Sequence, residues 1–233
     1  MKPRDFKDSI FEQLARVGAA FSSPKRVEII ELLAQGERTV ESVAAATGMS
    51  VANTSQHLNV LRNSGLVSSR RQGLYAFYRI SEDSVVTTFQ ALRSLAESRL
   101  AEVRQLAEAF FKEVDGAEPI GMEELLVRAA AGDVTVIDVR PRLEYEAGHL
   151  PGAVGIPLDE LPARLSEIDV GHRVVAYCRG PYCVMSAEAV TQLRLAGVDA
   201  QRLVGGPLEW REAGLPIVAG PGSDGLALAA STN

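Results

Sequence analysis

The chain has 233 residues, of which 46% are hydrophobic and 23% charged, so its composition is globular rather than disordered or collagen-like. Its length allows one large domain or two small ones, and no apolar run approaches the about 20 residues that span a bilayer. Two cysteines are too few for a disulfide framework or a four-cysteine zinc site, and the N-terminus lacks the apolar core of a signal peptide. We therefore expect a cytoplasmic protein that does not interact with membranes.

The charge is unevenly distributed along the chain. The net charge of −6 is made up of +1 over residues 1–115 and −7 over residues 116–233. No acidic residue occurs between Glu41 and Glu82, although four arginines lie there. A locally basic segment can bind a polyanion within an acidic protein, because affinity follows the local field. Charge alone still favours the alternative, which is an ordinary solvated surface.

The first part of the chain predicts short helices followed by a hairpin. Apolar spacing indicates helices over residues 6–20, 24–35, 40–47 and 51–64, with Ser23, Thr39 and Ser50 as N-caps. Residues 66–70 and 74–80 have the composition of two strands, joined by a turn at Gln72–Gly73. This order of elements predicts a mainly α-helical winged helix-turn-helix.

A long helix is expected from Ser84 to Val114, and it carries more apolar surface than a small domain needs, which suggests a homodimer. The polar segment 115–119 contains a glycine and a proline and is the expected domain boundary. Beyond it, apolar strands at 134–139 and 173–177 alternate with helices at 122–131 and 184–196, which predicts an α/β domain with a parallel sheet. We expect domains at 1–115 and 116–220, and a disordered tail at 221–233.

The predicted fourth helix has a polar face suited to the major groove of DNA. Small and amide side chains lie outward there, and Asn and Gln can bind adenine through two hydrogen bonds. The candidate base-reading residues are Ser50, Ala52, Asn53, Ser55, Gln56 and Asn59, and Arg70 and Arg71 of the wing are candidate phosphate contacts. His57, next to the inward Leu58, is expected to be structural.

This region resembles the ArsR/SmtB family of bacterial winged-helix repressors over about residues 10–112. The resemblance lies in the segment from Gly48 to Leu58, in the run His57 to Val67, and in the wing ending Tyr78-Arg79-Ile80. It implies a dimer bound to double-stranded operator DNA, with an inverted repeat as the preferred site.

The family's metal-sensing residues are absent from this sequence. The stretch Arg38 to Ser42, where metal-sensing members carry a Cys-x-Cys pair, has no thiol. The helix expected from Ser84 to Val114 has no histidine for the family's other site. Because thiolate and imidazole sites need those ligands, we expect no metal site and no cofactor.

Both cysteines lie in one short segment, Cys178-Arg179-Gly180-Pro181-Tyr182-Cys183. Cys178 ends an apolar strand, and a helix begins about five residues later, so the thiol is expected over backbone N–H groups and a helix N-terminus. Such a cradle stabilises anions, lowers a thiol pKa and can hold a persulfide. The alternative is an inert buried cysteine, but Gly180 and Pro181 shape a tight loop that packing alone does not need.

The second half resembles rhodanese (sulfurtransferase) domains over about residues 118–218. Three signatures carry the resemblance: Asp138-Val139-Arg140 with Glu144 and the run Gly148 to Pro157, the Cys178 loop, and Gly205-Gly206 with Trp210, Gly214 and Pro216. The six-residue loop has the length associated with sulfur transfer, so Cys178 is the implied nucleophile and a small sulfur compound the donor or acceptor. Asp138, Arg140, Glu144 and His149 are expected to be scaffold.

Cys183 is a departure, because many rhodaneses have a basic or hydroxyl residue there that helps to bind thiosulfate. Arg179 remains a candidate anion clamp, and Cys183 is either a resolving thiol or an incidental buried residue. Together these features predict a homodimeric transcriptional regulator, a repressor, whose rhodanese domain senses or transfers reactive sulfur. The alternatives are a sulfurtransferase whose winged helix serves dimerisation, and a catalytically silent interaction module.

Overall fold

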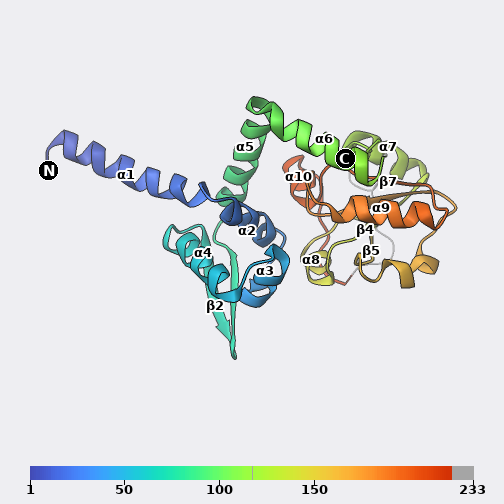
Figure 1. The fold of residues 1–233 in the computed structure, drawn as a ribbon, viewed down its shortest axis with the longest axis horizontal. Helices are drawn as coiled ribbons and strands as arrows, with labels where there is room; N and C mark the ends of the chain where they lie inside the picture. Colours follow the sequence, from blue (N-terminus) through green and yellow to red (C-terminus); the bar gives the residue numbers. More distant parts are fainter. Residues whose placement is uncertain (117, 222–233) are drawn as a thin grey trace. The chain divides into compact units, whose positions relative to one another are not determined.

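The computed structural model describes residues 1–116 and 118–221 of the chain. It forms two compact units, residues 1–99 and residues from 100 onward, and each is described separately below (Figure 1). The expected boundary at 115/116 thus differs from the division between compact units. Of the expected tail, residues 222–233 lie outside the described part. No helix of the described residues is long and apolar enough to cross a membrane.

The first unit is a winged helix-turn-helix. Its helices are α1 (Pro3–Phe21), α2 (Pro24–Ala34), α3 (Val40–Thr47), α4 (Val51–Asn63) and α5 (Asp83–Arg99), and its strands are β1 (Arg38–Thr39), β2 (Val67–Gln72) and β3 (Tyr75–Ile80). The strands form an antiparallel sheet in the order β1-β3-β2. The pairing of β1 with β3 was not foreseen, because it joins segments that are far apart in the sequence.

Local capping places the two helices of the motif. The Thr39 hydroxyl accepts a hydrogen bond from the backbone N–H of Ser42, and Ser50 accepts one from Asn53, as expected. Gly48 ends α3 with φ of 65°, a left-handed conformation that favours glycine. Ser23 precedes Pro24 as the N-cap of α2 without a capping side-chain hydrogen bond.

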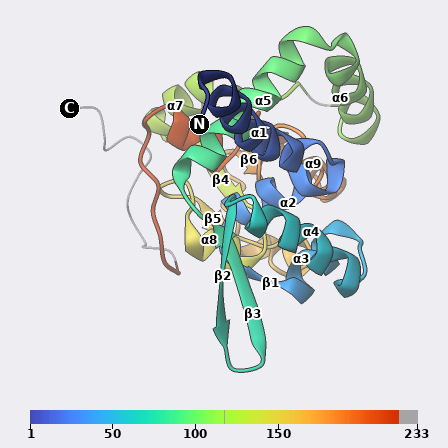
Figure 2. The same cartoon turned by 90° about the vertical axis from the view of Figure 1, so that its left-hand side faces the viewer.

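The wing is a β-hairpin whose tip lies one residue later than expected. Gln72 pairs with Tyr75, so the two-residue turn is Gly73–Leu74. Gly73 has φ of 60°, the conformation that a tight hairpin turn requires at its first central residue. Figure 2 shows the hairpin of β2 and β3 extending away from α3 and α4.

The expected single helix over residues 84–114 is wrong. The structure has two helices, α5 ending at Arg99 and α6 (Ala101–Val114), separated by Leu100 with an extended backbone. The C-terminal end of α6 is held by residues distant in sequence, since the Thr191 hydroxyl donates to the Val114 carbonyl at 2.9 Å and Arg194 to the Asp115 carbonyl at 3.1 Å. Periodicity along the chain continues through the break and therefore does not reveal it.

The second unit contains a parallel sheet in the order β5-β4-β6-β7. Its strands are β4 (Val134–Asp138), β5 (Val154–Gly155), β6 (Arg173–Tyr177) and β7 (Ala200–Arg202), and its further helices are α7 (Met122–Ala131), α8 (Arg142–Ala147), α9 (Met185–Leu195) and α10 (Pro207–Glu212), with short 3-10 turns at Leu161–Ala163 and Leu165–Glu167. The predicted bounds of α7 and β6 are confirmed.

Both faces of this sheet are covered, as the continuous apolar strands predicted. Val174 and Ala176 of β6 pack in one core with Val190 and Leu193 of α9. Tyr177, from the same strand, packs in a second core. That second core also contains Leu125 of α7 and Trp210 of α10. Burial on both faces fixes the carboxyl end of β6, which carries the first cysteine.

Candidate functional site

The outward face of α4 carries the residues predicted to read bases. Ala52, Asn53, Gln56 and Asn59 are exposed and Ser55 is half-buried. On the opposite side, Thr54, Leu58 and Leu61 are fully buried in the core of the unit, as expected from their spacing. The buried side fixes the rotation of the helix, so the polar face is presented as a rigid surface.

Internal hydrogen bonds distinguish the members of this face. Ser50 is exposed, but its hydroxyl oxygen accepts the capping hydrogen bond from Asn53 at 3.3 Å. The Asn59 carboxamide oxygen accepts from Arg62 Nη2 at 3.0 Å. The Gln56 side chain forms no hydrogen bond with any residue that the structure describes. Gln56 is therefore the amide on this face whose hydrogen-bonding groups are fully available.

The two wing arginines are not equivalent. Arg70 Nε donates to both carboxylate oxygens of Glu37 at 2.9 Å, Nη1 donates to the Gln72 carboxamide oxygen at 2.7 Å, and the guanidinium lies 4.7 Å from the Phe77 ring centroid. Arg71 is exposed and forms no ion pair within residues 1–116 and 118–221. Sequence reasoning missed Glu37, which forms an ion pair with the exposed guanidinium of Arg70.

The two cysteines lie at the carboxyl end of the parallel sheet. Cys178 directly follows β6, and Cys183 comes two residues before the first residue of α9. The Cys183 backbone N–H donates to the Gly180 carbonyl at 3.1 Å, which closes the loop. Beneath it lies Gly206, where a side chain would place its first carbon 2.2 Å from the Cys178 carbonyl oxygen. The close approach of these two segments thus requires glycine at position 206.

The two thiols differ in burial and in the direction in which their pKa is shifted. Cys178 is only 1% exposed; its Sγ donates to the Cys183 carbonyl at 3.4 Å, and the Ser186 hydroxyl oxygen lies 3.5 Å from the same sulfur. Burial raises the pKa of the Cys178 thiol well above its usual value. The expectation that the loop lowers this pKa is therefore wrong, because desolvation outweighs the hydrogen bonds to Ser186.

Cys183 has the opposite shift. It is partly exposed, and a hydrogen bond with Cys178 lowers its pKa most, assisted by the backbone N–H groups of Arg179 and Met185 and opposed by burial. A thiolate is the reactive form of cysteine. Cys183 is thus the thiol of this pair that is both more accessible and more readily ionised.

The guanidinium of Arg179 is engaged by a carboxylate from α8. Arg179 Nη2 donates to Glu144 Oε1 at 2.7 Å and Nε donates to both carboxylate oxygens at 3.0 Å, and the Glu144 side chain is 1% exposed. Sequence reasoning placed Glu144 in the scaffold but not against Arg179. This ion pair removes most of the positive charge that an anionic sulfur donor would need.

Other signature residues hold the backbone around the site. Arg140 Nη2 donates to Asp138 Oδ2 at 2.6 Å and to the Gly148 carbonyl at 2.7 Å, with both side chains of the ion pair buried. His149 Nδ1 lies 2.8 Å from the Tyr145 carbonyl oxygen, and the two rings are stacked. These contacts are the scaffold role expected for Asp138, Arg140 and His149.

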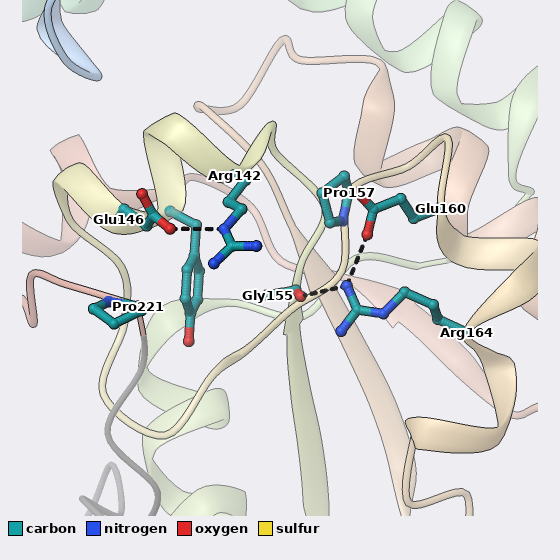
Figure 3. A pocket seen from close by; sticks show the side chains of 8 residues that line it. Arg142, Glu146, Gly155, Pro157, Glu160, Arg164 and Pro221 are labelled. Carbon is teal, nitrogen blue, oxygen red and sulfur yellow. Dashed lines mark hydrogen bonds and ion pairs between the residues drawn. The ribbon is translucent and has the colours of Figure 1, made fainter.

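A separate polar cavity of about 190 Å³ lies beside α8 and is lined by Arg142, Tyr145, Glu146, Gly155, Pro157, Glu160, Arg164 and Pro221 (Figure 3). Its arginines are paired, Arg142 with Glu146 at 2.7 Å and Arg164 with Glu160 at 2.9 Å. In the described part of the chain, no three His, Cys, Asp or Glu side chains are grouped so that they could hold a metal ion. The thiol loop remains the best-defined chemical site.

Two family models match the chain, one for each unit. The model described as "Bacterial regulatory protein, arsR family" matches residues 23–69, and the "Rhodanese-like domain" model matches residues 122–213. An HTH-type transcriptional regulator of Mycobacterium tuberculosis is 46% identical over 216 residues, which are 93% of this chain and 95% of that protein.

Two further proteins are similar to one half each. A sulfurtransferase of Allochromatium vinosum is 37% identical over 105 residues, 44% of this chain and 96% of that protein. The solution structure of a homodimeric winged helix-turn-helix DNA-binding domain from Mycobacterium bovis is 39% identical, with a TM-score of 0.41, and covers 44% of this chain and 93% of that one.

Proposed function

Because the chain belongs to the arsR family of HTH-type transcriptional regulators and carries a rhodanese-like domain, we propose that it is a repressor whose DNA affinity responds to sulfur bound at Cys178 and Cys183. The observation that carries the proposal is the loop itself: both thiols of the chain occupy one six-residue loop, and the Cys178 thiol donates to the Cys183 carbonyl. A regulator needs an input, and these are the reactive groups that the chain offers.

In this proposal DNA is read by α4 and held by the wing. Asn53 and Gln56 contact base edges, and Arg71 contacts phosphate, because these side chains are exposed and face away from the core. The apolar side chains of Phe6, Phe11 and Leu14 on α1 are more than half exposed. They support a homodimer, since a second copy would cover them, and a dimer would prefer an inverted repeat with half-sites about one helical turn apart.

The chain connectivity offers a route from the loop to the DNA-binding unit. The loop packs within the same unit as α6, and Leu100 alone separates α6 from α5 of the winged helix. In this proposal a change at the loop that shifts α6 acts on the backbone at Leu100, the residue that joins α6 to α5. A typical coupling between two sites is about 5–150-fold in affinity.

The test is a gel-shift titration on the chain's own upstream DNA. Wild type, Cys178→Ser and Cys183→Ser are each measured before and after treatment with inorganic polysulfide, and sulfur uptake is checked by intact-protein mass. We expect wild type to change affinity on treatment and both variants, each of which keeps only one thiol of the loop, to stay constant. Unchanged affinity of a confirmed sulfurated wild type would show that the two domains are linked without regulation.

A second candidate is a sulfurtransferase enzyme. The similarity to nearly the whole length of the Allochromatium vinosum sulfurtransferase favours it. In that case the purified protein transfers sulfur from a donor to cyanide over many turnovers, whereas a sensor is loaded once per thiol pair. Measuring turnover per protein chain separates these two functions.

A further inference from the structure

The tip of the wing carries a leucine that lies entirely in solvent. Leu74 is 100% exposed, and its neighbour Tyr75 is 56% exposed. Toward the base of the hairpin the apolar side chains are covered instead, since Phe77 is half-buried and Tyr78 is only 7% exposed. The packing of this unit therefore does not account for a leucine at position 74.

The conformation of the turn does not account for it either. Gly73 has φ of 60° and Leu74 has no positive φ, so the two-residue turn between Gln72 and Tyr75 is of type II′. This turn type requires glycine at its first central position only, and the residue that follows is typically Asn, Asp or Ser. A partner that covers the tip would explain the leucine, because an apolar side chain gains free energy on leaving water.

The charge of the hairpin indicates what kind of partner covers its tip. Residues 67–80 contain Arg70, Arg71 and Arg79 and no acidic residue. A basic ribbon is attracted to a polyanion, and phosphates border both sides of a DNA groove. DNA is thus the partner that matches both the arginines and the established family of the chain.

The dimensions of the hairpin decide which groove its tip enters. Two paired strands lie about 4.8 Å apart before their side chains are counted, whereas the minor groove of B-DNA is about 6 Å wide. The ribbon is too broad for that groove, but a single side chain at its turn is not. In the proposed function α4 occupies the major groove, and Figure 2 shows the hairpin extending away from α3 and α4. The groove next to the major groove along the duplex is the minor one.

We propose that Leu74 enters the minor groove beside the α4 half-site and selects A·T over G·C base pairs there. This inference rests on the DNA binding of the proposed function and adds a residue that contributes to operator selection. A G·C pair adds the guanine 2-amino group to the floor of the groove, and an A·T pair has no such group. An apolar side chain covers that donor without accepting its hydrogen bond, which is costly.

The test uses inosine, which pairs with cytosine as guanine does but lacks the 2-amino group. An I·C pair presents the same major-groove atoms as G·C, so α4 does not distinguish the two. Gel-shift titrations on the chain's own upstream DNA compare A·T, I·C and G·C at each base pair outside the α4 half-sites. The variant is Leu74→Asn, because Gly-Asn preserves the turn. Its matched control is Leu195→Asn at the end of α9, which is 84% exposed.

For wild type, we expect A·T and I·C to bind alike at one flanking position of each half-site. Both should bind at least about fivefold more tightly than G·C, the lower end of what one unfavourable base pair costs. Leu74→Asn should lose this preference, because its amide oxygen can accept from the amino group, and Leu195→Asn should match wild type. The slope of log affinity against log salt should be the same for Leu74→Asn as for wild type, since no charge is removed.

Three results would overturn the assignment of Leu74 while DNA binding itself stands. The first is an equal flanking preference in wild type and Leu74→Asn. The second is a reduced salt slope in Leu74→Asn, which would show that the turn serves only to place Arg71 on phosphate. The third is a changed sedimentation coefficient of free Leu74→Asn with no flanking preference in wild type, which would make the tip a contact between copies. Failure of wild type to bind any of the duplexes overturns the proposed function as well.

Discussion

The Glu144 carboxylate accepts hydrogen bonds from two nitrogens of the Arg179 guanidinium, Nη2 at 2.7 Å and Nε at 3.0 Å. Glu144 comes from α8 and Arg179 from the loop after β6, so the pair ties this helix to the thiol loop. The ion pair orders the loop, and it also withdraws the loop's cation from any anionic substrate.

Glu144→Gln should therefore release Arg179 and increase sulfur transfer from thiosulfate. It should also lower the free energy of unfolding by about 1–3 kcal/mol, because a buried charge loses its partner. Transfer to cyanide and denaturant unfolding measure the two effects. Glu146→Gln is the matched control, since its exposed pair with Arg142 contributes at most about 1 kcal/mol. No gain with thiosulfate would contradict the proposed blocking of Arg179.

Cys183 should be alkylated before Cys178 at pH 7. Its lowered pKa places thiolate at a lower pH than the usual value of about 8.5, whereas the raised pKa of Cys178 keeps that group a thiol at this pH. Labelling with iodoacetamide across pH 5–9, followed by peptide mass spectrometry, measures both rates.

A variant at position 178 is the control for the order in which the two cysteines are alkylated. Cys178→Ala removes the hydrogen bond from position 178 that lowers the pKa of Cys183, so labelling of Cys183 should shift to higher pH. Faster labelling of Cys178 than of Cys183 in wild type would contradict the predicted order.

Gln56→Ala and Asn53→Ala should relax base preference at single operator positions, at a cost of about 1–3 kcal/mol each. Gln56 should give the larger effect, because its amide has no internal partner in the described chain, whereas Asn53 Nδ2 lies 3.6 Å from Met49 Sδ. Binding to a set of operators with single base changes measures this. Gln13→Ala on α1 is the control, and a loss of affinity equal for all sequences would argue against base reading.

Arg71→Ala should weaken binding to all DNA sequences alike and reduce the slope of log affinity against log salt by about 1. Arg70→Ala should have a smaller effect, because the Arg70 guanidinium must leave the Glu37 carboxylate before it can contact a phosphate. By the same reasoning Glu37→Gln should strengthen binding, and Glu12→Gln on α1 should leave it unchanged. DNA-binding titrations at several salt concentrations test this ranking of the two arginines. Equal losses of DNA affinity in Arg70→Ala and Arg71→Ala would contradict it.

The sequence alone predicts much of the fold, because many helices and strands are set by interactions between residues that are close together in the sequence. Caps at Thr39 and Ser50 place the helices of the DNA-binding motif, and apolar runs place α7 and β6 at their observed bounds. Hydrophobic periodicity and helix capping involve residues within a few positions of each other, so both can be recognised from the sequence. The candidate thiols were also identified from their position after a strand.

What the tertiary structure decided is which side chains meet across long separations. Glu37 reaches Arg70 from 33 positions away, and Glu144 reaches Arg179 from 35 positions away. Val114 meets Thr191 across 77 positions, a contact that accompanies the break in the expected long helix. The sequence determined that the chain has a helix-turn-helix motif and a thiol loop. Folding determined which of their charges are neutralised and which thiol is buried, because burial and ion pairing depend on neighbours that the sequence does not place.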